Sequence, residues 1–256
     1  MHINIGTWDI VLLVVVSVQA TTLAYLYHPE WKAFIYSLPV PFTFATLALG
    51  RTVDATNVAG LILMLLYTHC VRILHQRFRL NIIFSIVLSA LGYCVIGGSV
   101  ARIMPRNDLV FWIATISAYL IVLVLYLRTP RRDEPGHRSP MPVWAKLPII
   151  MGVILVLIVL KSSLKGFMTL FPMVGVVAAY EARHSLWTIG RQIPVFSLAM
   201  IPMMVTIRLA EPHVGLGFSL VAGWVVFLSI LLPVNRSMRT ADARVSKRDS
   251  ELSKVM

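Results

Sequence analysis

Apolar stretches of roughly 18 to 20 residues recur along nearly the whole chain, with only short polar breaks between them. A helix of this length rises about 1.5 Å per residue and spans the roughly 30 Å of hydrocarbon in a bilayer. Of the 256 residues, 58% are hydrophobic and 13% are charged, whereas a soluble domain has about 25% charged residues. These features exclude a soluble fold and predict an all-α, polytopic transmembrane helix bundle.

Hydropathy predicts nine helices, five before and four after a polar break at Arg128–Met141 that has the composition of an exposed loop. The predicted helices are Ile10–Tyr27, Ala33–Leu49, Thr56–Leu74, Leu80–Ile103, Leu109–Leu127, Val143–Leu160, Leu164–Glu181, Ile193–Ile207 and Val214–Val234. The first apolar stretch has no basic region before it and no small-residue cleavage signal after it, so we expect it to be retained. The polar, basic residues after Asn235 predict a solvated tail.

Lysine and arginine predict the orientation of these helices. With nine crossings and the N-terminus outside, 17 of the 23 basic residues fall on the cytoplasmic side. The six that fall outside are Arg51, Arg102, Arg106, Lys161, Lys165 and Arg208. The positive-inside rule therefore favours an N-out, C-in topology, and merging or splitting one helix would remove the asymmetry.

Composition and missing motifs also restrict function. In a membrane protein, a net charge of +12 indicates loop orientation and attraction to anionic lipid head groups, and it does not favour nucleic-acid binding. Cys70 and Cys94 fall inside predicted helices without metal-ligand spacing. The sequence has no Walker loop, no HExxH helix and no Ser/His/Asp group. We expect no metal, no cofactor and no catalytic residues, with membrane lipids as partners. The sequence does not determine the oligomeric state.

An internal repeat is the most informative pattern. At an offset of 133, Lys32-Ala-Phe34 followed by Leu38-Pro39 matches Lys165-Gly-Phe167 followed by Phe171-Pro172. At an offset of 134, Phe84-Ser85-Ile-Val87 matches Phe218-Ser219-Leu-Val221, and Arg102-x-Met104 matches Arg236-x-Met238. Coincidence between apolar segments is the alternative, but matching order, spacing and helix boundaries favour duplication.

The predicted repeat has a topological consequence. Four helices return the chain to its starting side and helix 5 then crosses once more, so the two copies, helices 1–4 and 6–9, must be inverted. The expected organisation is a first four-helix repeat at 1–106, a linking helix and cytoplasmic loop at 107–142, a second repeat at 143–235 and a basic tail at 236–256. Many secondary transporters use inverted repeats to obtain two exchangeable conformations, one open to each side.

Prolines lie inside the second predicted helix of each copy. Pro39, with Pro41, and Pro172 each remove a backbone hydrogen bond and free a carbonyl, and such breaks can line a binding site. A harmless kink is the alternative, because proline is common in transmembrane helices.

Charged residues near these helices are further candidates for binding a substrate. Lys32 and Lys165 would place an ammonium near the N-terminal end of a broken helix, where it could attract an anion; the alternative is a lysine that reaches out to the membrane surface. Glu181 could bind and release protons if it is buried, or it could form an interfacial salt bridge with Arg183. Asp54 and Asn57 favour a helix cap.

Small residues at Ser85 and Ser89, matched by Ser219 and Gly223, predict a seam of close helix contact between the two halves.

Three segments of the second copy resemble the small, four-helix GlpM-like proteins of the bacterial inner membrane. They are Phe171-Pro172-Met-Val, Phe196-Ser-Leu-Ala-Met-Ile-Pro202 and Gly217-Phe-Ser-Leu-Val-Ala-Gly-Trp224. The first copy departs from this pattern, having His69 where the second has Pro202. The resemblance covers about a third of the chain and implies a cytoplasmic-membrane location and a link to exopolysaccharide production, with no catalytic residues to carry over.

The sequence therefore favours a secondary transporter or lipid-substrate translocator that contacts an anionic substrate near Pro39 and Pro172. The alternative is a non-transporting scaffold or accessory subunit of envelope polysaccharide assembly. A polar, water-accessible cavity in the middle of the bundle would favour the first function, and a packed apolar interior would favour the second.

Overall fold

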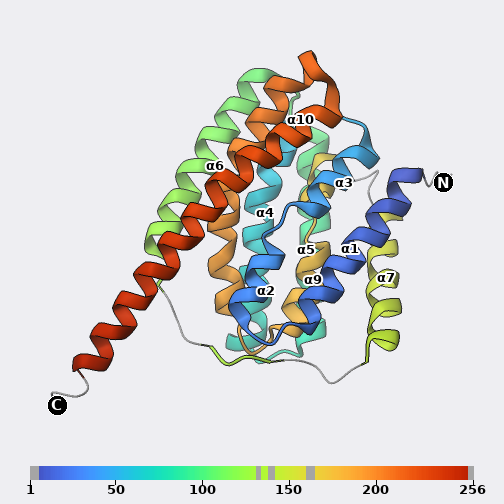
Figure 1. Ribbon diagram of the computed structural model, residues 1–256. Coiled ribbons are helices and arrows are strands. Elements are labelled where there is room, and N and C mark those ends of the chain that lie inside the picture. The colour runs from blue at the N-terminus through green and yellow to red at the C-terminus, as the bar shows by residue number, and fades with distance from the viewer. Residues whose placement is uncertain (1–5, 131–133, 138–141, 160–164, 253–256) are drawn as a thin grey trace.

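A computed structural model describes residues 6–130, 134–137, 142–159 and 165–252 of the chain. Every element in this described part is helical. The helices stand side by side in an elongated bundle, with the N-terminus and the C-terminus at opposite ends (Figure 1). The predicted all-helical fold class is thus confirmed for the described residues.

The first half of the chain runs up and down the bundle through neighbouring helices. These are α1 (Thr7–Tyr25), α2 (Pro29–Tyr36), α3 (Val40–Leu49), α4 (Ala55–Arg72) with its π-helical extension η1 (Ile73–Arg77), α5 (Ile82–Ile103) and α6 (Asp108–Arg128). The second half contains α7 (Val143–Val159), the short 3-10 helix η2 (Lys165–Leu170), α9 (Met173–Glu181) and α10 (Leu186–Leu252).

Helix α10 holds both of the last two predicted helices. It is bent back on itself at Gly215, whose φ of 75° is a left-handed value that favours glycine. We call residues 186–214 its first arm and residues 216–252 its second arm. The second arm continues to Leu252, so the expectation that the helix ends at Val234 is wrong.

The start of α4 confirms the predicted cap. The Asp54 carboxylate accepts a hydrogen bond from the Thr56 N–H at 2.8 Å, and the Asn57 side-chain oxygen accepts from the Asp54 N–H at 2.8 Å. The Asn57 amide also donates to the Thr169 hydroxyl at 2.8 Å. This reciprocal cap satisfies donors that a helix start leaves free, and it ties α4 to η2.

Small residues bring helices together within each half of the chain. Ser85 is fully buried on α5, which packs against α4. A Cβ on Gly223 would lie 2.8 Å from the Ile207 side chain, so this glycine lets the two arms of α10 approach each other. The Gly223 contact joins the two arms of α10 within the second half of the chain, so the expected seam between the halves is wrong for this residue.

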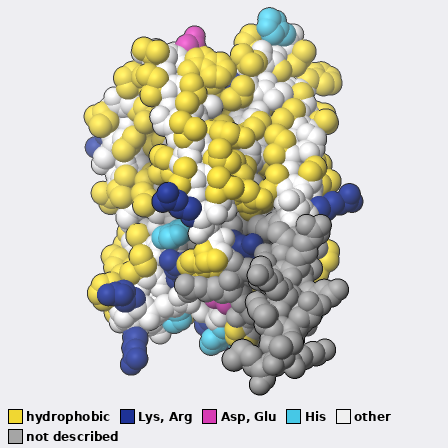
Figure 2. Space-filling model, turned by 90° about the vertical axis from the view of Figure 1, so that its left-hand side faces the viewer, with side chains coloured by type: hydrophobic (Ala, Val, Ile, Leu, Met, Phe, Trp, Pro, Cys, Tyr) yellow, Lys and Arg dark blue, Asp and Glu magenta, His cyan; other side chains and the backbone are white. Residues whose placement is uncertain are grey.

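The outer surface of the bundle is apolar over most of its height. Large side chains that are more than half exposed include Ile83 and Leu91 on α5, Ile116 on α6, and Phe218 and Val225 on α10. Figure 2 shows hydrophobic side chains covering one such face, with Lys and Arg side chains mainly in its lower half. Soluble monomers rarely expose apolar patches of this extent.

Six helical segments of the described residues are long and apolar enough to cross a membrane. They are Thr7–Tyr25, Pro29–Leu49, Ala55–Arg77, Ile82–Ile103, Asp108–Arg128 and Leu186–Ser237. Trp144–Leu155 is a shorter apolar helix. These lengths and this surface are compatible with a multi-pass membrane protein.

Candidate functional site

Two helix breaks, one in each half of the chain, have the same form. α2 ends at Tyr36 and α3 begins at Val40, with Pro39 as the residue before its first turn. η2 ends at Leu170 and α9 begins at Met173, with Pro172 in the same role. The predicted helices Ala33–Leu49 and Leu164–Glu181 are thus each divided at their prolines, because a proline has no N–H to continue the preceding helix.

Side chains from other helices satisfy the carbonyls near these breaks. The Gln19 amide donates to the Ile35 carbonyl at 2.8 Å and to the Leu38 carbonyl at 3.3 Å. The Tyr93 hydroxyl donates to the Phe167 carbonyl at 2.8 Å. Non-helical backbone at membrane depth is stable only when its polar groups are satisfied in this way.

Thr43 connects the first break to the second half of the chain. Its hydroxyl donates to the Pro39 carbonyl at 2.9 Å and accepts a hydrogen bond from the Trp224 indole N–H at 2.8 Å. The second arm of α10 is thereby held against the start of α3.

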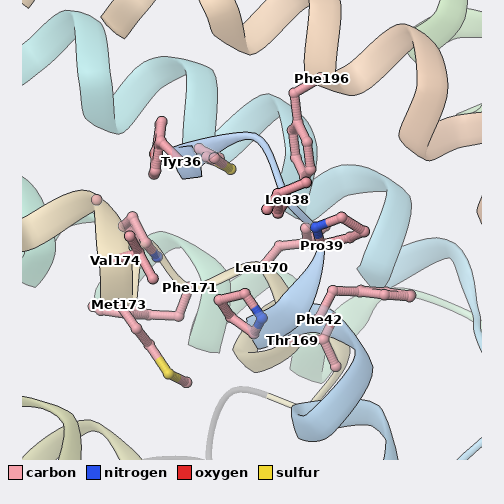
Figure 3. Close-up of a pocket in the computed structure, with 14 residues that line it drawn as sticks. Tyr36, Leu38, Pro39, Phe42, Thr169, Leu170, Phe171, Met173, Val174 and Phe196 are labelled. Atoms are coloured by element: carbon pink, nitrogen blue, oxygen red, sulfur yellow. The ribbon is translucent and has the colours of Figure 1, made fainter. Parts of the chain in front are cut away.

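The two breaks meet at one cavity of about 30 Å³. Its lining includes Leu38, Pro39 and Phe42 from the first break and Phe171 and Pro172 from the second. Figure 3 shows side chains of both segments around the same space. This volume holds about two water molecules, and the lining is mostly apolar, so the cavity is too small for a substrate in this conformation.

Close packing surrounds the cavity where α9 begins. A Cβ on Gly175 would lie 2.7 Å from the Pro172 Cβ and 2.8 Å from the Tyr36 hydroxyl. Only a residue without a side chain therefore fits in this first turn. Both α3 and α9 begin at the cavity, so the partial positive ends of two helix dipoles lie beside it.

A buried cluster of charged groups lies at the end of the bundle where α7 begins and α9 ends. Lys32 is 1% exposed, and its ammonium donates to the Glu181 carbonyl at 2.8 Å and to the His137 carbonyl at 2.7 Å. The Lys146 ammonium lies 2.9 Å from the Glu181 carboxylate and 4.7 Å from the centre of the Tyr25 ring. Two ammonium groups thus contact Glu181 inside the protein, Lys32 at its backbone carbonyl and Lys146 at its carboxylate, and we call Lys32, Lys146 and Glu181 the charge cluster.

Glu134, in the described part of the loop between the two halves, also lies at this end of the bundle, beside the start of α10. The Glu134 carboxylate accepts hydrogen bonds from the Trp187 N–H at 3.2 Å and the Thr188 N–H at 2.7 Å. It therefore caps the start of α10, where an anion is favourable. The Trp187 indole N–H donates to the Pro130 carbonyl at 2.9 Å.

His137 anchors the same loop on the charge cluster. Its carbonyl accepts from Lys32, and its ring lies 4.8 Å from the His184 ring in an edge-to-face contact. Burial, together with the positive charge of Arg183, lowers the pKa of His137 below its ordinary value of 6.5.

The structure brings four of the six expected site residues into two places. Pro39 and Pro172 meet at the cavity, while Lys32 and Glu181 meet in the charge cluster. Lys32 is buried rather than extended to the membrane surface. Lys165 is the first residue of η2, and its side chain lies outside the described part.

Arg183 lies beside the charge cluster. Its guanidinium donates to the Tyr180 carbonyl at 3.3 Å and lies over the Tyr180 ring. Glu181 forms an ion pair with Lys146, which the sequence places only among the basic residues on the cytoplasmic side. The sequence feature that could have identified Lys146 is its place as a lone lysine at the start of an apolar helix, where a charge needs a partner. Gln19, a lone amide within the first apolar stretch, gave the same kind of signal.

Comparison of the chain with protein-family models, with curated proteins and with solved structures gives no match.

Proposed function

We propose that the chain crosses the bacterial cytoplasmic membrane nine times. The crossings are α1, α2 with α3, α4 with η1, α5, α6, α7, η2 with α9, and the two arms of α10. The loops after α1, α4, α6 and α9 lie at the end of the bundle that also holds the C-terminus (Figure 1). Basic residues at this end include Arg72, Arg77, Arg79, Arg128 and Arg191. The positive-inside rule makes this end cytoplasmic and the N-terminus external.

The two halves are proposed to be inverted repeats. α3 begins 133 positions before α9, and each follows a proline break. From the shared cavity, α3 runs toward the end of the bundle that holds the N-terminus, while α9 runs toward the opposite end (Figure 1). A two-fold axis in the membrane plane would relate such segments. The GlpM-like resemblance of the second half is compatible with a fused pair of four-helix units.

The function that this geometry supports best is a secondary transporter or lipid-substrate translocator for an anionic substrate. The observation that carries the proposal is that the two proline breaks line one cavity in the middle of the bundle. Broken helices that begin at the midplane place positive dipole ends near a substrate in transporters of this architecture. The small volume then corresponds to a closed conformation, and movement of one half against the other would enlarge the cavity.

A second function is favoured by the same small cavity. A mostly apolar cavity with room for only about two water molecules suits a scaffold or accessory subunit of envelope polysaccharide assembly that moves no substrate. In that case the loop near Glu134 and the basic second arm of α10 would contact partner proteins or anionic lipid.

Cysteine labelling distinguishes the two functions. Leu38→Cys and Val174→Cys place one thiol from each break in the cavity, in a background where Cys70 and Cys94 are alanine. Ala178→Cys is the matched control, because Ala178 is fully buried on α9 and does not line the cavity. Transport predicts that a membrane-impermeant maleimide labels both cavity positions from either side of the membrane and leaves the control unlabelled. No labelling at either cavity position would contradict transport and favour the scaffold.

A further inference from the structure

An open groove lies between α4 and α5 on the outer surface of the bundle. It has a volume of about 150 Å³ and is lined mainly by apolar side chains, among them Leu63 and Leu74. Leu66, Leu88 and Ile96 also line it and are 51%, 44% and 46% exposed. The groove therefore opens on the apolar surface that the proposed topology places against lipid, where hydrocarbon chains take the place of water.

Three residues that line this groove carry a hydroxyl group, and one of them, Tyr93, donates its hydroxyl hydrogen bond to the Phe167 carbonyl. Tyr67 from α4 and Ser89 from α5 are 4% and 7% exposed. Neither hydroxyl has a hydrogen-bond partner among the described residues. A buried polar group without a partner is costly at membrane depth, so the groove suits a hydrocarbon chain that also carries a hydrogen-bond acceptor.

Two arginines, Arg77 and Arg79, lie just beyond the cytoplasmic end of the groove. Leu74 is the lining residue nearest that end, and Arg77 and Arg79 follow it as exposed residues on either side of Phe78. Ser89 lies seven positions after Ile82, the first residue of α5 at this end, which corresponds to about 10 Å along the helix axis. The glycerophosphate of a phospholipid and an extended arginine side chain together span such a distance.

We propose that this groove binds an anionic glycerophospholipid from the cytoplasmic leaflet. One acyl chain fills the groove, an ester oxygen accepts a hydrogen bond from the Ser89 hydroxyl, and the phosphate lies near Arg77 and Arg79. The charge complementarity favours an anionic head group over a neutral one. This proposal rests on the membrane location and does not depend on transport.

Gly92 provides a direct test because it lines the groove and a Cβ added there would meet no atom within 4 Å. Gly92→Leu should fill the groove without disturbing the helices. Gly98→Leu is the matched control, since Gly98 lies on the same helix, also has open space, and does not line the groove. The probe is dioleoyl-phosphatidylglycerol, titrated into detergent-purified full-length protein and followed by native mass spectrometry.

We expect Gly92→Leu to weaken phosphatidylglycerol binding at least about tenfold, as expected when a ligand chain loses its apolar site. Gly98→Leu should change it less than about twofold. Ser89→Ala should weaken binding about fivefold and should not change the binding of the ether-linked analogue, which lacks ester carbonyls. Arg77→Gln with Arg79→Gln should abolish the preference for phosphatidylglycerol over phosphatidylcholine.

Equal binding by wild type and Gly92→Leu would overturn the site. Equal binding of ester, ether, anionic and neutral lipids to wild type and Ser89→Ala would show that the groove takes any alkyl chain, detergent included, and would overturn the phospholipid assignment. Neither result bears on the cysteine labelling of the central cavity, so the two proposals fail separately.

Discussion

Replacing Glu181 by Gln should destabilise the protein more than any other single charge change in the charge cluster. The substitution leaves the buried Lys146 ammonium without its carboxylate partner, and it removes a negative charge that attracts the Lys32 ammonium. The hydrogen bond from Lys32 goes to the backbone carbonyl of Glu181 and does not depend on this side chain. At 2.9 Å and an effective dielectric constant of about 20, the attraction between Glu181 and Lys146 is roughly 6 kcal/mol. Desolvation of both groups offsets part of this attraction. Removing one partner of a buried pair costs about 3–5 kcal/mol, which is the loss in free energy of unfolding that we expect for Glu181→Gln.

Substitution of the partner lysine, Lys146, shows how much of that loss in stability comes from the ion pair between Lys146 and Glu181. Lys146→Met keeps the side-chain volume, and Glu181 then still has the Lys32 ammonium nearby. We therefore expect Lys146→Met to cost less than Glu181→Gln. The double variant should be more stable than the sum of the two losses predicts, with a coupling of about 1–3 kcal/mol. Arg77→Gln is the control, because this exposed cation should change stability by less than about 0.5 kcal/mol.

The measurement is reversible unfolding of the purified protein in mixed micelles, by titration with a denaturing detergent and detection of helix content. The free energies of wild type, both single variants, the double variant and the control are compared at one pH. A Glu181→Gln variant within about 1 kcal/mol of wild type would refute the reasoning, since it would mean that the buried Lys146 ammonium does not depend on this carboxylate.

Three further predictions concern the cavity and the loop. Gly175→Ala forces movement of Tyr36 or Pro172 and should lower the free energy of unfolding by about 1–3 kcal/mol, whereas Gly98→Ala, with open space around it, should be neutral or stabilising in the same assay. Glu134→Gln weakens the cap on α10 and should lower the free energy of unfolding by about 1 kcal/mol. Hydrogen exchange should accelerate at the start of α10. Acceleration only at residues far from this helix start would contradict the role of Glu134 as a cap. Because the pKa of His137 is lowered in the folded protein, the docked loop favours the neutral ring, so its stability should be lost as the pH falls from about 6.5. Hydrogen exchange of residues 134–137, corrected for intrinsic rates, should accelerate at pH 5.5 relative to pH 7.5, and this acceleration should be absent in His137→Gln.

The helical elements could largely be predicted from the sequence, because apolar length and proline position have direct local causes. The breaks at Pro39 and Pro172 follow from the missing N–H of proline, and the cap at Asp54 follows from its position before an apolar run. The long second arm of α10 could not be predicted in this way. Its residues beyond Val234 are polar, and polarity alone does not distinguish an exposed helix from an irregular tail.

The charge cluster was only partly predictable for a different reason. Lys32 and Glu181 stood out as charges near apolar helices, but their spatial relation depends on how α2, α7 and α9 pack. Lys146 lies in the first turn of its predicted helix and is counted with the cytoplasmic charges, and no local signal shows that this helix start is buried. The partners of Gln19 likewise depend on the contact between α1 and the first break.

The charge cluster also sets a condition on how the chain is made. Lys32 and the Glu181 carbonyl that it contacts are 149 positions apart, so at synthesis rates of about 5–20 residues per second the lysine waits roughly 7–30 s for this acceptor. Lys146 is likewise synthesised before its ion-pair partner Glu181. A nascent chain that stops before α9 therefore lacks the carbonyl and the carboxylate that these two ammonium groups contact, and α9 must be added before this end of the bundle can reach its final packing.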